Sequence, residues 1–90
     1  MDKLIEARNI ISEADKQIAE LFEKRMNAVK QVAEYKKERG LPIFDSARED
    51  EVIRNSMSYI ADEDIKELYL PFIKGVIDIS KDYQQKLMSE

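Results

Sequence analysis

The sequence predicts an all-α fold of three helices, one very long and two shorter. Two glycines and two prolines in 90 residues are too few for a loop-rich or β-sandwich fold. Charged residues make up 38% of the chain and hydrophobic residues 43%, a balance typical of long amphipathic helices. No glycine or proline precedes Gly40, so nothing interrupts a helix in the first part of the chain.

The first predicted helix covers about residues 4–39 and closes at Gly40-Leu41-Pro42. Its apolar residues recur at the three- and four-residue spacing of a helix face: Leu4, Ile11, Ile18, Phe22, Val29 and Val32. Such a helix is about 50 Å long, which is too long for a compact monomer of this size. We therefore expect it to cross a second copy of the chain in an intertwined helical homodimer.

The two remaining helices are expected at about residues 45–59 and 62–87, within a single domain that covers 1–90. Ser46 and Glu49 have the spacing of a capping box at the start of the second helix. Asp62 and its acidic neighbours favour a helix start, because negative charge is stabilising there. Pro71 falls inside the third helix and is expected to bend it or to remove one backbone hydrogen bond.

Composition excludes several classes of chemistry and of partner. The chain has no cysteine and no histidine, which rules out disulfides, thiolate chemistry, Cys- or His-ligated metal sites and a Ser-His-Asp triad. A net charge of -4 argues against nucleic-acid binding. The N-terminus lacks the apolar run of a signal peptide, and no segment has the ~18 apolar residues of a membrane span. We expect a soluble cytoplasmic protein with no metal, nucleic-acid or membrane partner.

Four charged residues interrupt the apolar face of the first helix: Arg8, Asp15, Arg25 and Lys36. Burying an unpaired charge is strongly unfavourable, so a simple coiled coil would rarely accept all four. One interpretation is control of the pairing register, which suits Asp15 well, while the long basic side chains reach water at the edge of the interface. The other interpretation is a binding site for an anion inside the helix bundle.

Helix geometry limits how these cations can combine. Arg25 and Lys36 are about 16 Å apart along the axis, so their side chains can converge on one small ligand. Arg8 lies about 25 Å from Arg25, so it can join that site only from another subunit. An antiparallel pair of long helices with its two-fold axis near Ile18 would place Arg8 of the partner subunit there and create two equivalent sites.

The other two helices carry further candidates, each with a plain structural alternative. Glu49 either contacts a ligand or is the capping-box partner of Ser46. Arg48 either contacts a ligand or is an exposed charge near the start of the helix. In the third helix, one face carries Ile73, Ile77, Ser80 and Gln84, which change from apolar to polar along the helix. The two polar residues either contribute to a binding site or lie at a solvent-exposed helix end. A site of this kind would contain cations, an amide and a carboxylate but no nucleophile. Such a site can bind a small dianion and stabilise the charge that develops on it during a rearrangement.

These residues carry a resemblance to a known family, over about residues 4–85. The pattern Arg8, Ile11, Asp15, Ile18, Leu21 and Arg25, followed by Tyr35-Lys36, resembles the first helix of the all-helical chorismate mutases. The string Pro42-Ile43-Phe44-Asp45-Ser46-Ala47-Arg48-Glu49 resembles that family's loop and second-helix start. Ile73, Ile77, Ser80 and Gln84 resemble its third helix.

The resemblance implies an isomerase that converts chorismate to prephenate by a Claisen [3,3] rearrangement, a step of the shikimate pathway toward phenylalanine and tyrosine. Arg25 and the partner's Arg8 would bind the two substrate carboxylates. Lys36 would contact a carboxylate and the ether oxygen, and Gln84 would donate to that oxygen. The remaining residues would bind substrate: Glu49 at the ring hydroxyl, helped by the backbone near Asp45, with Arg48 and Ser80 completing the lining. No cofactor is implied.

Two other functions fit the same residues. An isochorismate-pyruvate lyase would use a similar cationic pocket on the same fold. A non-enzymatic helical dimerisation module would use the charged positions only to set its register. Turnover of chorismate and of isochorismate, or the absence of both, separates these three functions.

Overall fold

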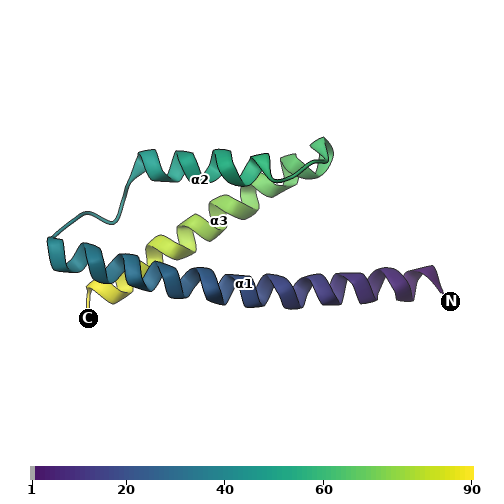
Figure 1. Ribbon diagram of the computed structural model, residues 1–90, viewed down its shortest axis with the longest axis horizontal. Coiled ribbons are helices and arrows are strands. Elements are labelled where there is room, and N and C mark those ends of the chain that lie inside the picture. Colours follow the sequence, from purple (N-terminus) through teal and green to yellow (C-terminus); the bar gives the residue numbers. More distant parts are fainter. Residues whose placement is uncertain (1) are drawn as a thin grey trace.

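The computed structural model describes residues 2–90 and contains three α-helices in that range, with no strand. They are α1 (Lys3–Arg39), α2 (Ser46–Ser58) and α3 (Glu63–Met88). α1 follows the long axis of a molecule that measures 57 × 26 × 14 Å. α3 crosses from the end of α2 back to α1 and packs against both helices (Figure 1). The predicted all-α architecture of one long and two shorter helices is confirmed.

Both ends of α1 are defined by local chemistry. The side chain of Asp2 accepts a hydrogen bond from the Leu4 backbone N–H at 2.8 Å, so the helix begins at Lys3. At the other end Gly40 has a φ of 64°, a left-handed conformation that glycine adopts without strain. The Leu41 N–H then donates to the Lys36 carbonyl at 2.9 Å and closes the last turn.

The start of α2 differs from the expected capping box. Asp45, not Ser46, is the capping residue, because its carboxylate accepts a hydrogen bond from the Arg48 backbone N–H at 3.1 Å. The prediction that Glu49 serves as capping partner of Ser46 is therefore wrong. Glu49 lies one position too far along the helix to reach back to the cap, and its carboxylate points toward α3 instead.

Asp62 caps α3, where its carboxylate accepts hydrogen bonds from the backbone N–H groups of Asp64 and Ile65. Pro71 lies inside this helix, which nevertheless continues from Glu63 to Met88. Proline has no backbone N–H, so the carbonyl four residues earlier loses its helical donor. Pro71 and Glu67, the residue that carries this carbonyl, are both exposed.

The buried side chains lie where the C-terminal half of α1 meets α3. Ala33, Ile73 and Ile77 are the apolar side chains that are buried in the described chain, and two polar ones accompany them, Ser80 and Gln84. This is a small core for a chain of 90 residues. The polar members of the core belong to the site described below.

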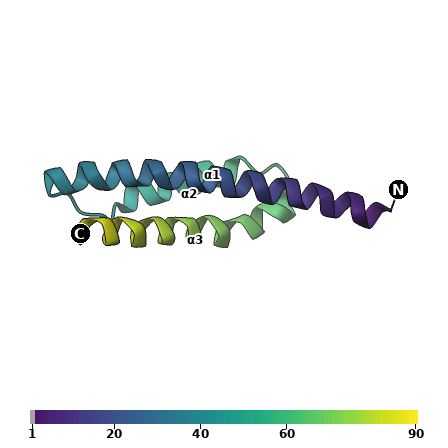
Figure 2. The same cartoon turned by 90° about the horizontal axis from the view of Figure 1, so that it is seen from below.

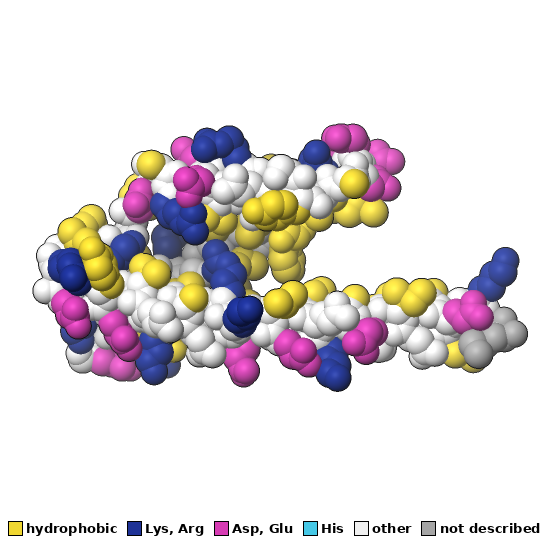
Figure 3. Space-filling view, in the orientation of Figure 1, with side chains coloured by type: hydrophobic (Ala, Val, Ile, Leu, Met, Phe, Trp, Pro, Cys, Tyr) yellow, Lys and Arg dark blue, Asp and Glu magenta, His cyan; other side chains and the backbone are white. Residues whose placement is uncertain are grey.

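The N-terminal part of α1 extends past both other helices (Figures 1 and 2). Its apolar stripe is left uncovered, with Ile11 57% and Ile18 50% exposed, and Leu4 and Phe22 are also exposed. Figure 3 shows hydrophobic side chains following the edge of α1 on the side where α2 and α3 lie. Within residues 2–90, therefore, nothing covers this apolar stripe. None of the described helices is long and apolar enough to cross a membrane.

Candidate functional site

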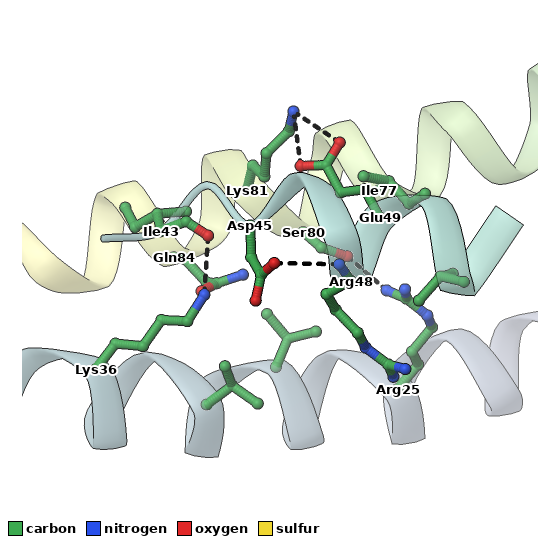
Figure 4. A pocket seen from close by; sticks show the side chains of 13 residues that line it. Arg25, Lys36, Ile43, Asp45, Arg48, Glu49, Ile77, Ser80, Lys81 and Gln84 are labelled. Atoms are coloured by element: carbon green, nitrogen blue, oxygen red, sulfur yellow. Dashed lines mark hydrogen bonds and ion pairs between the residues drawn. The ribbon is translucent and has the colours of Figure 1, made fainter. Parts of the chain in front are cut away.

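A pocket lies between the C-terminal half of α1, the start of α2 and the C-terminal half of α3 (Figure 4). It has a volume of about 160 Å³. The three helices and the loop before α2 all contribute side chains, which are Arg25, Val29, Val32, Lys36, Ile43, Asp45, Arg48, Glu49, Val52, Ile77, Ser80, Lys81 and Gln84.

Helical periodicity explains why these residues converge. On α1 the lining residues follow the i, i+4, i+7, i+11 spacing of one helix face, from Arg25 to Lys36. On α3 the row Ile77, Ser80 and Gln84 has the i, i+3, i+7 spacing of one helix face, and this face lies toward α1. The polar end of that row is therefore buried, and the alternative of a solvent-exposed helix end is wrong for Ser80 and Gln84.

Arg25 is held from α3. Its Nη1 donates a hydrogen bond of 2.5 Å to Ser80 Oγ, and Ser80 Oγ in turn donates to the Val76 carbonyl at 2.7 Å. Burial lowers the pKa of Arg25 below its ordinary value, and the charge of Arg48 lowers it further, while Tyr69 acts in the opposite direction. Arg25 forms no ion pair with any carboxylate in residues 2–90. A fixed, partly desolvated guanidinium of this kind suits an anionic ligand.

Lys36 is the second cation lining the pocket that forms no ion pair with a carboxylate in residues 2–90. Its Nζ donates to the backbone carbonyl of Ile43 at 2.8 Å, in the loop that leads to α2 (Figure 4). This bond uses one of the three ammonium donors and orients the group toward the pocket. Two donors remain for a ligand.

Gln84 supplies the amide of the pocket. Its side chain is 8% exposed, and its Oε1 has no hydrogen-bond partner within residues 2–90. A buried polar atom left unpaired is unfavourable, so an incoming ligand or water that bonds this amide would be stabilising. The two ends of an amide can exchange by a half-turn, so Gln84 can present either a donor or an acceptor.

The charges of the pocket do not cancel. Four cations and two carboxylates line it, an excess of two positive charges: Arg25, Lys36, Arg48 and Lys81 against Asp45 and Glu49. The carboxylates are already engaged, because Asp45 caps α2 and Glu49 pairs with Lys81. Arg48 also forms an ion pair with Glu51 outside the pocket, so its guanidinium is shared with the surface. The pocket therefore favours a small ligand with two negative charges.

The structure brings together seven of the eight residues that the sequence nominates for the site. Arg25, Lys36, Asp45, Arg48, Glu49, Ser80 and Gln84 all line the pocket. Arg8 does not, because it lies exposed on the projecting part of α1, about 25 Å along the helix axis from Arg25. Lys81 also lines the pocket and is not among the residues predicted from the sequence, although its position four residues after Ile77 and beside Ser80 places it at the edge of the same helix face.

The arrangement can bind and polarise but offers little for covalent chemistry. Histidine and cysteine do not occur in the sequence, and residues 2–90 contain no cluster of acidic side chains arranged to hold a metal ion. Fixed cations and an amide in a partly desolvated pocket can restrain a flexible dianion and stabilise charge that develops on one of its oxygens.

Comparison with known families agrees with this geometry. The family model of chorismate mutase type II matches residues 7–85, which includes α2, most of α1 and α3, and every polar residue of the pocket. The same chain matches no curated protein and no solved structure.

Proposed function

Because the chain belongs to the chorismate mutase type II family, we propose that it catalyses the Claisen [3,3] rearrangement of chorismate to prephenate. The observation that carries the proposal is the grouping of Arg25, Lys36 and Gln84 in one pocket. Within residues 2–90 these two cations form no ion pair with a carboxylate, and the amide oxygen has no hydrogen-bond partner. Chorismate carries two carboxylates, and the excess of two positive charges in the pocket matches them.

The contacts of the pocket support a division of roles. Arg25, held by Ser80, binds one substrate carboxylate. Lys36 contacts a carboxylate and the ether oxygen, and Gln84 donates to that oxygen. Glu49 accepts a hydrogen bond from the ring hydroxyl, aided by the backbone near Asp45. Arg48 completes the polar lining together with Ser80.

The rearrangement needs no group from the protein to form a covalent bond. One C–O bond breaks while one C–C bond forms within the substrate, and negative charge develops on the ether oxygen. Lys36 and Gln84 stabilise that charge. Lys36 needs little reorganisation, because its hydrogen bond to the Ile43 carbonyl holds it in place in advance. The cations that bind the carboxylates hold the side chain over the ring in the reactive conformation.

We further propose that the working unit is a homodimer. The uncovered apolar stripe on the projecting part of α1, which includes Ile11 and Ile18, is the surface that a second α1 would cover. Antiparallel pairing about a two-fold axis near Ile18 sets Arg8 of the partner subunit against the stretch from Arg25 to Lys36. That arginine then contacts the second carboxylate, which Arg8 of the same chain cannot do because it lies about 25 Å from Arg25 along the helix axis.

Loss of the ultraviolet absorbance of chorismate tests the proposal, with prephenate identified as the product. Wild type is compared with Arg25→Ala and with Arg54→Ala, which removes an exposed arginine of α2 outside the pocket. We expect saturable turnover that Arg25→Ala abolishes and Arg54→Ala leaves intact, while circular dichroism shows equal helix content in all three.

Isochorismate is assayed in parallel. Release of pyruvate from isochorismate without turnover of chorismate would replace the proposal by the lyase. Failure to turn over either compound, by a folded wild-type dimer, would favour the non-enzymatic dimerisation module.

A further inference from the structure

Lys81 is the one cation of the pocket whose ammonium group is paired with a pocket carboxylate. Its Nζ lies 3.3 Å from Glu49 Oε2 and 3.5 Å from Glu49 Oε1, so it faces both oxygens. The Lys81 side chain is 33% exposed and the Glu49 side chain 24%, so the pair is largely shielded from water. It connects α3 to the first turn of α2.

Two further neighbours fix the ammonium group. Asp78 Oδ1 lies 3.8 Å from Lys81 Nζ, farther than either oxygen of Glu49, and the Asp78 side chain is 72% exposed. Asp78 is thus the weaker partner. The ring of Phe44 has its centroid 5.3 Å from the same Nζ, a cation–π contact from the loop before α2. Lys81 is therefore held at Glu49 from two sides.

This arrangement leaves the pocket side of Glu49 free. In Figure 4 the Lys81 ammonium lies beyond the Glu49 carboxylate, on the side away from Arg25 and Lys36. A carboxylate has about four lone-pair sites, so one cation does not exhaust its capacity. Without Lys81 the flexible Glu49 side chain could turn toward solvent, and it would lose rotamer freedom each time it bound a ligand.

We propose that Lys81 is a positioning residue, which holds the Glu49 carboxylate where it accepts a hydrogen bond from the substrate's ring hydroxyl. It thereby favours a substrate with a hydroxyl at that ring position over one without it. The inference rests on the proposed function and deepens it, because it names the group that makes the hydroxyl contact selective. Lys81 itself does not touch the substrate in this arrangement.

A purely structural role makes a different prediction. If Lys81 only joins α3 to α2, its loss lowers stability and affects all substrates of the pocket equally. If it positions Glu49, its loss affects only substrates that use Glu49, and only while Glu49 is present. Substrate dependence and a double-mutant cycle separate the two roles.

The test measures kcat/KM for chorismate and for an analogue that lacks the ring hydroxyl. The variants are Lys81→Met, Lys81→Arg, Glu49→Gln and the double variant Lys81→Met/Glu49→Gln. Lys66→Met is the matched control, because Lys66 forms an ion pair with Glu63 on the same helix at 3.4 Å, outside the pocket. Circular dichroism and thermal unfolding accompany each variant, and Lys81→Gln replaces Lys81→Met should the latter not fold.

We expect Lys81→Met to lower kcat/KM for chorismate about tenfold, a typical effect of misplacing one charged hydrogen-bond acceptor. Lys81→Arg should recover most of this loss, and Lys66→Met should lose nothing. On the hydroxyl-free analogue, and in the Glu49→Gln background, removal of Lys81 should change kcat/KM less than about twofold.

Equal losses on both substrates, additive losses in the double variant, or no loss on chorismate would each overturn the positioning role. Wild-type turnover of chorismate distinguishes this failure from failure of the proposed function. If the wild type is active and the Lys81 variants keep its kcat/KM, only the inference about Lys81 is refuted. If a folded wild type is inactive, the inference and the proposed function are both refuted.

Discussion

Arg25 Nη1 and Ser80 Oγ are joined by a hydrogen bond of 2.5 Å that ties the middle of α1 to the C-terminal half of α3. Ser80 is buried, and its hydroxyl also donates to the backbone of its own helix at Val76. The serine thus cannot turn away without losing two bonds. A guanidinium fixed in this way presents its remaining donors in one direction, toward the pocket.

Ser80→Ala tests this relationship. Removing the hydroxyl frees Arg25 to change rotamer, so we expect kcat/KM for chorismate to fall about tenfold with helix content unchanged. Ser89→Ala is the matched control, because Ser89 Oγ donates to the Gln85 carbonyl at 2.8 Å, the same bond to a residue four earlier, but lies exposed at the end of α3. Equal activity of the two variants would mean that Arg25 needs no support from α3.

Arg25→Met separates binding from stability. Arg25 is partly buried and forms no ion pair with a carboxylate of the described residues, and its lowered pKa means that the fold disfavours its charge. We expect the neutral side chain to leave the thermal midpoint unchanged or to raise it, while chorismate turnover falls about 100-fold or more. Thermal unfolding followed by circular dichroism measures the first effect. A lower midpoint would show that Arg25 stabilises the fold.

The pKa of Arg25 also predicts the pH response of the wild type. A lowered pKa means that the unfolded chain binds the proton more tightly, so stability rises with pH only between the folded and unfolded pKa values. That window is strongly alkaline, and below it Arg25 is charged in both states. Gln84 does not titrate at all. We expect these two groups to add no slope to stability or kcat/KM between pH 6 and 9; steep loss near neutrality would contradict their roles.

Gln84→Glu should create a pH dependence that the wild type lacks. Burial would raise the pKa of a carboxyl introduced at this position, while the pocket cations act in the opposite direction. Only the neutral form could donate to the ether oxygen. We expect about tenfold higher kcat/KM at pH 5 than at pH 8. Gln85→Glu, at the exposed neighbouring position, is the control and should follow the wild-type profile. The same profile for both variants would remove Gln84 from the reaction.

Helix ends were predictable because their determinants are local. Asp2, Asp45 and Asp62 lie at the three N-caps, and Gly40 ends α1, all within one or two residues of the expected positions. The spacing on α1 and α3 also predicted which polar residues share a face with the core. The wrong prediction at the start of α2 also has a local cause. Ser46 and Asp45 are adjacent candidates for the N-cap, and the capping-box spacing favoured Ser46, whereas Asp45 is the capping residue.

Contacts between helices were harder to predict. Nothing in the sequence around Lys81 distinguishes it from an ordinary lysine on a helix surface. It meets Glu49 only because α3 packs against the start of α2. The support of Lys36 by the Ile43 carbonyl depends on the path of the loop, which no side-chain pattern encodes. Hydrophobic periodicity defines the face that a helix buries, but not the neighbour it meets there.

The role of the partner's Arg8 predicts recovery of activity from two inactive variants. In a dimer of one Arg8→Ala chain and one Arg25→Ala chain, one site keeps both arginines and the other keeps neither. Random pairing makes half of the dimers mixed, so refolding or co-expressing the variants together should restore about a quarter of wild-type sites. Each variant alone should be inactive, and light scattering should show a dimer throughout. Lys36→Ala mixed with Arg25→Ala is the control: both residues belong to the same chain's half of each site, so no mixed dimer contains an intact site. No recovery in the Arg8 mixture would mean that Arg8 does not act across the dimer, and recovery in the control would mean that Arg25 and Lys36 of one site come from different chains.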